Sequence, residues 1–132
     1  MNQLDKAKIE NRIATKIIEA AFEVYDQLGP GLMESAYSYC LMLEFKEKGL
    51  AFKSELALPI EYKSHKLNHH YRLDFLVEDK VVIELKATES IHEVHYAQLL
   101  TYLKLSRRKL GLLINFHSSF FKSGIKRVVN GL

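Results

Sequence analysis

The sequence predicts an α/β (α+β) domain in which helices flank a central mixed β-sheet, with elements in the order ααβββαββ. Two stretches near the start carry apolar residues at helical spacing, and three later segments alternate apolar and polar residues. A third helical stretch then separates these segments from a short apolar run. A length of 132 residues suits one hydrophobic core rather than two, so we expect a single domain over residues 1–132.

The first two elements are predicted to be helices. Residues 11–28 carry an apolar stripe at steps of three and four residues, which is typical of an amphipathic helix. The stripe consists of Ile13, Ile17, Ala20, Val24 and Leu28. Gly29-Pro30-Gly31 ends this helix, because glycine suits a left-handed cap and proline cannot continue a helix. A second helix is expected over about residues 33–48, and apolar residues on several of its sides indicate that most of it is buried.

Three β-strands are expected after the second helix, because apolar and polar residues alternate there. They comprise residues 55–62, 69–77 and 81–87. Pro59 places the first strand at a sheet edge or at a bulge, because proline has no N–H to donate to a neighbouring strand.

The remaining elements are a helix and two strands. The third helix is predicted for about residues 91–105. The apolar run at residues 110–116 is typical of a strand that is covered on both faces. Residues 125–129 are expected to add a final strand, which completes the predicted order.

The composition is that of a globular protein and excludes several classes of function. Hydrophobic residues make up 48% of the chain and charged residues 27%, and no apolar run approaches the ~20 residues that a membrane span needs. We therefore expect no membrane partner and a cytoplasmic location. Cys40 is the only cysteine, which excludes an internal disulfide and a cysteine-only zinc site. The net charge of +3 permits binding to nucleic acid without requiring it.

Two charged residues share one face of the third predicted strand. Because side chains alternate along a strand, Glu84 and Lys86 point to the same side of the sheet. In the preceding strand, the same rule puts Asp74 on the opposite face from Leu73 and Phe75. The relative register of the two strands then determines whether these charged groups meet.

The turn between the two strands sets that register. If residues 78–80 form a three-residue loop, Val77 pairs with Val81 and Asp74 falls directly across from Glu84 on the same side of the sheet. A two-residue loop would put the two carboxylates on opposite faces. We predict the three-residue loop and the pairing of the two acids.

Asp74, Glu84 and Lys86 are the parts needed to hydrolyse a phosphodiester. Two neighbouring carboxylates repel each other, and hard divalent cations such as Mg²⁺ seek carboxylate oxygens. A metal lowers the pKa of its bound water and stabilises charge on a phosphate, while a lysine two residues on can bind a phosphate oxygen or help activate the water. The alternative is an ordinary surface hairpin whose charges lie in solvent.

Residues on two predicted helices favour the functional interpretation. Glu34 begins the second helix on the same stripe as apolar residues, so its carboxylate is expected to have a partner. A glutamate that only complements the helix dipole is the alternative. Gln98 and Tyr102 lie four residues apart on one face of the third helix, where the alternative is a core tyrosine beside a half-buried amide.

Four segments taken together carry the resemblance to a known family. They are Gly31-Leu32-Met33-Glu34-Ser35-Ala36-Tyr37, Arg72-Leu73-Asp74-Phe75, Glu84-Leu85-Lys86 and Gln98-Leu99-Leu100-Thr101-Tyr102. The ordered set resembles the GxxExxY family of the PD-(D/E)XK nuclease superfamily, in its RecB-like branch. The resemblance extends from about Ile13 to Val129 and implies a restriction-endonuclease-like fold.

The resemblance implies a role for four charged residues. Asp74 and Glu84 match the metal-binding acids of the superfamily, and Lys86 matches its catalytic lysine. Glu34 matches a helix glutamate that completes or supports the metal site. The implied metal is Mg²⁺ or Mn²⁺, held by these three acids.

Further site residues are implied by the same motifs. Gln98 would orient the lysine or the substrate, and Tyr102 is the second residue of its motif. Tyr37 and Arg72 belong to the other motifs and are expected to support the site. One departure is that Leu73, rather than proline, precedes the aspartate.

The leading functional hypothesis is a metal-dependent nuclease that cuts DNA, with RNA left open as a substrate. A Holliday-junction-resolvase-like endonuclease is an alternative within enzymes and would act as a homodimer. A second alternative, from another class, is a module on the same fold that binds nucleic acid or protein without cutting. The sequence also leaves open a protein partner that selects the substrate.

Zinc is a less favoured alternative for this chain. His92 and His95 are three residues apart and share a helix face, but neither cysteines nor an H-E-x-x-H string support a zinc site. We instead expect a histidine beside the cleft to contact phosphate.

Overall fold

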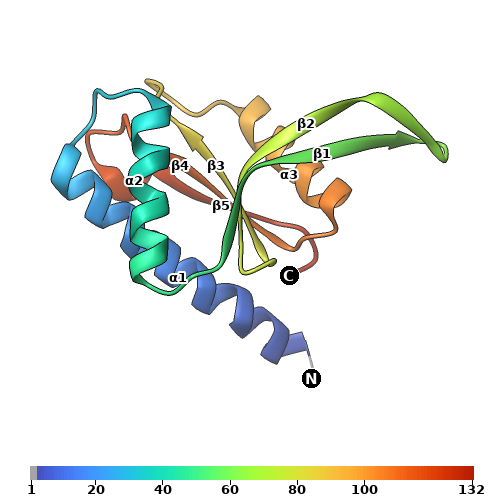
Figure 1. The fold of residues 1–132 in the computed structure, drawn as a ribbon, viewed down its shortest axis with the longest axis horizontal. Coiled ribbons are helices and arrows are strands. Elements are labelled where there is room, and N and C mark those ends of the chain that lie inside the picture. Colours follow the sequence, from blue (N-terminus) through green and yellow to red (C-terminus); the bar gives the residue numbers. More distant parts are fainter. Residues whose placement is uncertain (1–2) are drawn as a thin grey trace.

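Five strands in one mixed sheet, flanked by three helices, make up the fold (Figure 1). A computed structural model describes residues 3–132, with side chains from Ile9 onward, so residues 1 and 2 of the predicted domain lie outside the described part. The strands lie side by side in the order β1-β2-β3-β4-β5. The predicted α+β class and element order are confirmed.

The elements have the following bounds. The helices are α1 (Gln3–Leu28), α2 (Glu34–Glu47) and α3 (Glu93–Ser106), and a short 3-10 helix, η1 (Phe121–Gly124), precedes the last strand. The strands are β1 (Phe52–Tyr62), β2 (His65–Val77), β3 (Val81–Lys86), β4 (Leu110–Asn115) and β5 (Ile125–Val129). Compared with the prediction, α1 begins earlier, both β1 and β2 are longer at their N-terminal ends, and η1 is new.

The sheet combines antiparallel and parallel pairing. β1 with β2, β2 with β3 and β4 with β5 run antiparallel, whereas β3 and β4 run parallel and are connected through α3. Pro59 lies on the edge strand β1, and the register shifts between Pro59 and Glu61, so both features predicted from the proline are confirmed. All six residues of β4 are buried, as expected for a strand covered on both faces.

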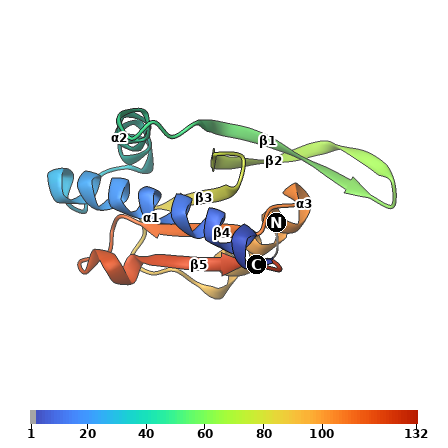
Figure 2. The same ribbon diagram turned by 90° about the horizontal axis from the view of Figure 1, so that it is seen from below.

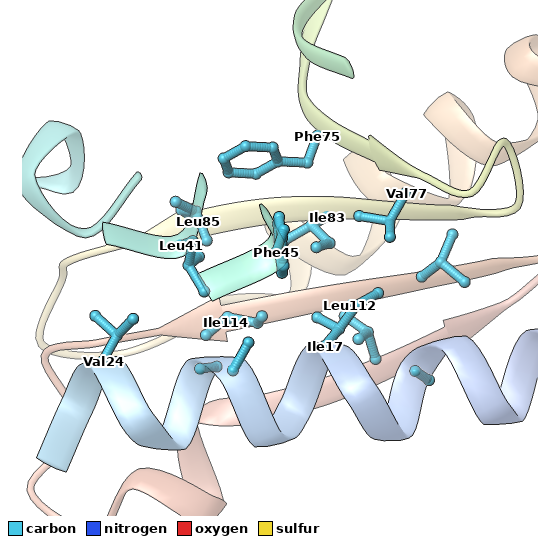
Figure 3. Close-up of a cluster of buried hydrophobic side chains, with 14 of the residues drawn as sticks. Ile17, Val24, Leu41, Phe45, Phe75, Val77, Ile83, Leu85, Leu112 and Ile114 are labelled. Carbon is cyan, nitrogen blue, oxygen red and sulfur yellow. The ribbon is translucent and has the colours of Figure 1, made fainter. Parts of the chain in front are cut away.

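One hydrophobic core lies between the sheet and the first two helices. Figure 3 shows Ile17 and Val24 of α1 and Leu41 and Phe45 of α2 together with the inward-facing side chains of β2, β3 and β4. Those strand residues are Phe75, Val77, Ile83, Leu85, Leu112 and Ile114. Burial of large apolar side chains, worth about 1.5–3 kcal/mol each, fixes the two helices on this face.

A second, smaller core lies between the other face of the sheet and α3. Leu99 and Leu103 of α3 pack there with Val82 and Leu113. Gly111 of β4 lets the helix approach closely, because a Cβ at this position would lie 2.9 Å from a methyl carbon of Leu99. The distance between α3 and the sheet therefore depends on this glycine.

Helix α2 is less buried than its composition predicts. Tyr37, Leu41 and Phe45 form the buried stripe, but Tyr39 and Leu43 are 69% and 62% exposed. The expectation that most of this helix is buried was wrong, because the helix lies at the edge of the core and only one face meets the sheet.

Strands β1 and β2 extend well beyond the rest of the sheet as a two-stranded hairpin (Figures 1 and 2). We call residues 59–72 of this hairpin the arm. Every arm residue from 61 to 72 is exposed. In the part of the chain that the structure describes, no helix is long and apolar enough to cross a membrane.

Candidate active site

The candidate site lies where β2 separates from β3. The two strands pair through Val77 with Val81, Leu76 with Val82 and Phe75 with Ile83. The loop at residues 78–80 therefore has three residues, and the predicted register is confirmed. The paired ladder ends at this point, and β2 continues away from β3 as part of the hairpin with β1.

Asp74 and Glu84 lie across from each other at the end of the ladder. The Glu84 carboxylate accepts a hydrogen bond from the Asp74 backbone N–H at 3.3 Å, and the Asp74 carboxylate accepts one from the Leu85 backbone N–H at 2.7 Å. Each carboxylate thus accepts the backbone N–H that a carbonyl of the opposite strand would accept in a regular ladder. The two acids are fixed to the fork between the strands by these reciprocal bonds.

The local path of β2 departs from strict alternation at Asp74. Leu73 packs in the smaller core with Leu76, although strict alternation predicted that it would share a face with Phe75. That prediction was wrong because the hairpin is irregular here: Glu55, which lies opposite Asp74 on β1, has a positive φ of 51° and is missing from the pairing. The irregularity turns β2 as it leaves β3.

Glu84 is a buried acid whose charge is disfavoured. The residue is only 8% exposed. Burial, followed by the charge of Asp74 and its side-chain hydrogen bond, raises the pKa of Glu84 to about 9, while the Asp74 N–H and the charge of Lys86 oppose this shift. Two carboxylates that adjoin in a low-dielectric place have the chemistry that a divalent cation satisfies, so these residues fit a metal site.

Lys86 lies two residues after Glu84 at the half-buried end of β3. Asn115 is its partner in β4, and the backbone carbonyl of Lys86 accepts a hydrogen bond from Phe116 N–H at 2.9 Å. The predicted proximity of the lysine to the acid pair is supported by the effect of its charge on the pKa of Glu84.

Glu34 reaches the same region from the N-terminal end of α2. It lines a hollow of about 190 Å³ together with Asp74, Arg72 and Glu55, and the Arg72 guanidinium lies 3.7 Å from the Glu55 carboxylate. Among the residues that the structure describes, however, no three His, Cys, Asp or Glu side chains are placed to hold a metal ion together. Glu34 thus shares the hollow with Asp74 without joining the acid pair directly.

Tyr37 lies in the core rather than in the hollow. Its hydroxyl donates to the Gly29 carbonyl at 2.7 Å and accepts from the Leu32 N–H at 3.1 Å. Its ring stacks on that of Phe116, with the two ring centroids 4.3 Å apart. These contacts hold the loop that precedes α2. Tyr37 therefore fixes the start of the helix on which Glu34 lies.

Gln98 and Tyr102 approach the fork from α3, on the other side of the hairpin. Tyr102 is buried, whereas Gln98 is exposed. Burial, then the charges of Glu84, Tyr71 and Asp74, raise the pKa of Tyr102, and a hydrogen bond with the Gln98 side chain opposes this rise. The pair thus lies within electrostatic reach of both acids, beside a hollow of about 300 Å³.

The comparison with family models agrees with this geometry. Residues 11–128 match the model described as the PD-(D/E)XK nuclease superfamily. The chain belongs to this superfamily. A search of curated proteins and a search of solved structures each returned no match.

Membership of the PD-(D/E)XK superfamily agrees with the mixed sheet and its flanking helices, which form a restriction-endonuclease-like fold. Nucleases of the superfamily generally use divalent metal ions, and their substrates are nucleic acids. The elements that carry the predicted site residues all fall within the matched residues. The roles of the individual residues remain predictions.

Asn115 is a site residue of this PD-(D/E)XK protein that the sequence analysis missed. It is 2% exposed, and its side-chain amide binds both the N–H of Thr88 at 3.2 Å and the carbonyl of Thr88 at 2.9 Å. It also accepts from the N–H of His117 at 3.2 Å. Asn115 thereby fixes the backbone just after Lys86. A polar residue in the otherwise apolar run of β4 was the available signal.

His95 is a second neighbour of Lys86 whose position the sequence did not reveal. Burial, then the charges of Lys86 and His92, lower the pKa of His95. Its Nδ1 accepts a hydrogen bond from the His92 N–H at 3.0 Å, which caps the start of α3. The spacing of His92 and His95 was visible in the sequence. In the structure the two histidines cap the start of α3, close to Lys86.

Proposed function

We propose that this protein is a nuclease that uses Mg²⁺ or Mn²⁺ to hydrolyse phosphodiester bonds in DNA. The observation that carries the proposal is the pair of carboxylates, Asp74 and Glu84, held together by reciprocal backbone hydrogen bonds with Glu84 buried. Keeping two adjoining acids in such a place lowers stability, and a cation-dependent function accounts for that loss.

Asp74 and Glu84 would hold the metal ion, and Glu34 would support it from across the hollow that it shares with Asp74. When bound, a divalent cation makes water a stronger nucleophile near neutral pH and offsets the negative charge of the scissile phosphate. Glu34 begins α2 and is exposed, which leaves its side chain room to turn toward such an ion.

Lys86 and Gln98 would act on the substrate itself. The Lys86 ammonium, at the end of the buried strand β3, would bind a phosphate oxygen beside the acids and stabilise negative charge as it develops. Gln98 would orient this lysine or the substrate from α3, with Tyr102 beneath it. Arg72, which lines the hollow near Asp74, would add a second positive charge for phosphate.

We also propose the finer assignments that the sequence motifs imply. These are membership of the GxxExxY family in the RecB-like branch, and a single nuclease domain over residues 1–132. Action as a homodimer or with a substrate-selecting protein partner is tested by size-exclusion chromatography, because a resolvase-like enzyme must make two symmetric cuts.

The direct test is cleavage of linear, single-stranded and branched DNA, with RNA alongside, by the purified protein in Mn²⁺ or Mg²⁺. Lys86→Ala should abolish cutting. Lys80→Ala is the matched control, because Lys80 lies in the exposed turn at the other end of the same two strands and should leave cutting unchanged. Equal activity of the two variants would exclude the assigned role of Lys86.

A module that binds nucleic acid without cutting is the second candidate. It is favoured by one observation: in the described residues no three acids or histidines are arranged to hold a metal ion. Calorimetric titration with Mn²⁺ separates the two candidates. Binding by the natural protein that disappears in Asp74→Asn supports the nuclease, whereas intact substrates and no Mn²⁺ binding support the module.

A further inference from the structure

Apart from Arg72, the arm has a surface that the proposed chemistry does not use. Residues 61–72 are all exposed, so neither face of this part of the hairpin is stabilised by a core. Two-stranded hairpins are marginally stable on their own. The turn at its tip also places Lys63 and Ser64 at positive φ, 50° and 69°, which residues other than glycine, asparagine and aspartate adopt at a cost. A long exposed arm with these costs calls for a function.

The two faces of the arm differ in chemistry. Arg72, His70 and Lys66 lie on one face of the arm, since they pair with Ala57, Pro59 and Glu61, which alternate along β1. Asn68 lies in the irregular stretch between Lys66 and His70, and we call these four residues the polar row. Tyr71 and His65, which pair with Leu58 and Tyr62, lie on the opposite face. The opposite face turns toward α3, because the ring of Tyr71 lies 5.4 Å from that of Tyr102.

The polar row leads into the candidate active site. Arg72 at its inner end lines the same hollow as Asp74 and Glu34. From Asp74 outward, the row therefore places several groups that can bind phosphate or donate a hydrogen bond along β2. The row and the acid pair form one continuous surface that begins at the fork.

The charge of the arm favours a polyanion. Its cations are Lys63, Lys66 and Arg72, and its single acid is Glu61, which lies across from Lys66. Three histidines add further hydrogen-bonding groups. Phosphate contacts from lysine, arginine and asparagine are those that position a protein on nucleic acid.

Pairing with a strand of another protein fits the arm less well. The free edge of the hairpin belongs to β1, and Pro59 together with the register shift before Glu61 interrupts that edge. Proline and irregular pairing are the features by which edge strands avoid adding a further strand.

We propose that the polar row is a track for the phosphate backbone of a DNA strand that leaves the active site. This inference rests on the proposed nuclease function and extends it to how the substrate is held. Along β1, the stretch from Glu55, opposite Asp74, to Glu61, opposite Lys66, spans about 20 Å, since each residue step along a strand adds about 3.3 Å. A separate, extended strand advances further per nucleotide than the ~3.4 Å of a stacked duplex, so the track accommodates fewer than about six nucleotides.

The test measures binding of end-labelled single-stranded DNA of 4, 8, 12 and 16 nucleotides by fluorescence anisotropy, with EDTA present so that no cutting occurs. Two matched pairs separate the polar row from the rest of the arm. His70→Glu lies in the row, and His65→Glu lies on the opposite face, where His65 pairs with Tyr62. Lys66→Glu lies in the row, and Lys63→Glu lies in the tip turn.

The track predicts that each row variant weakens binding of the longer strands several-fold more than its matched control. The slope of log Kd against log salt should fall by about 0.7 for each phosphate that a variant no longer neutralises. Lys66→Glu should weaken binding of the 4-nucleotide strand least, because a short strand can bind at the Arg72 end of the row without reaching Lys66. Thermal unfolding of all four variants should match that of the natural protein, since the positions are exposed.

Equal weakening by row and control variants, or an effect of Lys66→Glu that is as large on the shortest strand as on the longest, would overturn the track. The outcomes also separate the two proposals. If the natural protein binds DNA as predicted but does not cut it with Mn²⁺, the nuclease assignment fails and the track stands. If it cuts DNA with Mn²⁺ but binds none of these strands, the track fails and the nuclease assignment stands.

Discussion

The two ends of strand β2 lie in opposite surroundings. At its C-terminal end the strand is buried between β1 and β3, with helices α1 and α2 on one face and α3 on the other. At its N-terminal end, from His65 to Arg72, every residue is exposed on a hairpin that leaves the sheet. The boundary between the two regions lies between Arg72 and the buried Leu73, next to Asp74. Stability is therefore concentrated on one side of the candidate site, and a surface free to contact other molecules lies on the other.

The comparison predicts that an acid in the covered sheet and an acid in the arm respond differently to removal of charge. Glu84→Gln should lower nuclease activity about 100-fold or more, because it removes a carboxylate proposed to hold the metal. Without divalent metal it should also stabilise the protein at pH 8. Glu61→Gln, in the exposed arm, should change neither property.

The direction of this stability change follows from the raised pKa of Glu84. Its pKa is about 9 in the folded protein against 4.5 ordinarily, so the folded protein keeps a proton that the unfolded chain releases. Stability should fall as the pH rises from about 4.5 to about 9, and this fall should be reduced in Glu84→Gln. Thermal unfolding across that range in EDTA measures it. A pH profile unchanged by the substitution would contradict a buried, protonated Glu84.

Two leucines compare the contribution of packing in the sheet with that in the arm. Leu112 is fully buried in β4, whereas Leu67 is 43% exposed in the arm. Leu112→Ala should reduce the free energy of unfolding by about 2–5 kcal/mol, because the substitution removes buried apolar surface and leaves a cavity. Leu67→Ala should change it by less than about 0.5 kcal/mol. Urea denaturation provides both values. A large destabilisation in Leu67→Ala would mean that the arm is part of the cooperative core.

Two asparagines test the polar contacts. Asn115→Ala leaves the backbone of Thr88 without its amide partner and should cost about 1–3 kcal/mol. Because the backbone after Lys86 is then unsupported, kcat should fall while KM changes little. Asn68→Ala in the arm should spare kcat and stability and, because Asn68 belongs to the polar row, should change only KM. If Asn115→Ala were less stable but kept its full kcat, the residue would be structural only.

The smallest expected effect concerns two tyrosine hydroxyls. Tyr37→Phe removes the hydroxyl that binds Gly29 and Leu32, and should cost about 1 kcal/mol together with a modest decrease in activity as the start of α2 loosens. Tyr62→Phe, near the exposed tip of the arm, should be neutral for stability. If the denaturation curves of the two variants superimpose, the Tyr37 hydroxyl does not stabilise the loop before α2.

The division of β2 into a buried end and an exposed end also explains which features the sequence could predict. Where a strand has one buried face, burial imposes the side-chain period, so the three-residue loop at 78–80 and the pairing of Val77 with Val81 followed from the pattern. In the arm no burial imposes a period. Residues 65–68 are accordingly missing from the predicted strand, although they are in β2.

Other features escaped because they depend on distant contacts. The face of Leu73 depends on the irregularity at Glu55 of the neighbouring strand. The role of Asn115 depends on Thr88, which is remote in the sequence. The acid pair itself was predictable because local alternation and one short turn position both residues. The limited burial of α2 was not predictable, since composition does not reveal how many faces of a helix meet the sheet.

The two-residue turn at Lys63 and Ser64 gives the protein a point at which its sequence can change freely. Exposed hairpin tips tolerate insertions, and this one is separated from the acid pair by the length of the arm. The tip can therefore be exchanged or lengthened while the fork at Asp74 stays as it is. If the polar row holds the substrate as proposed, the segment of β2 that holds it is separate from the segment that carries Asp74.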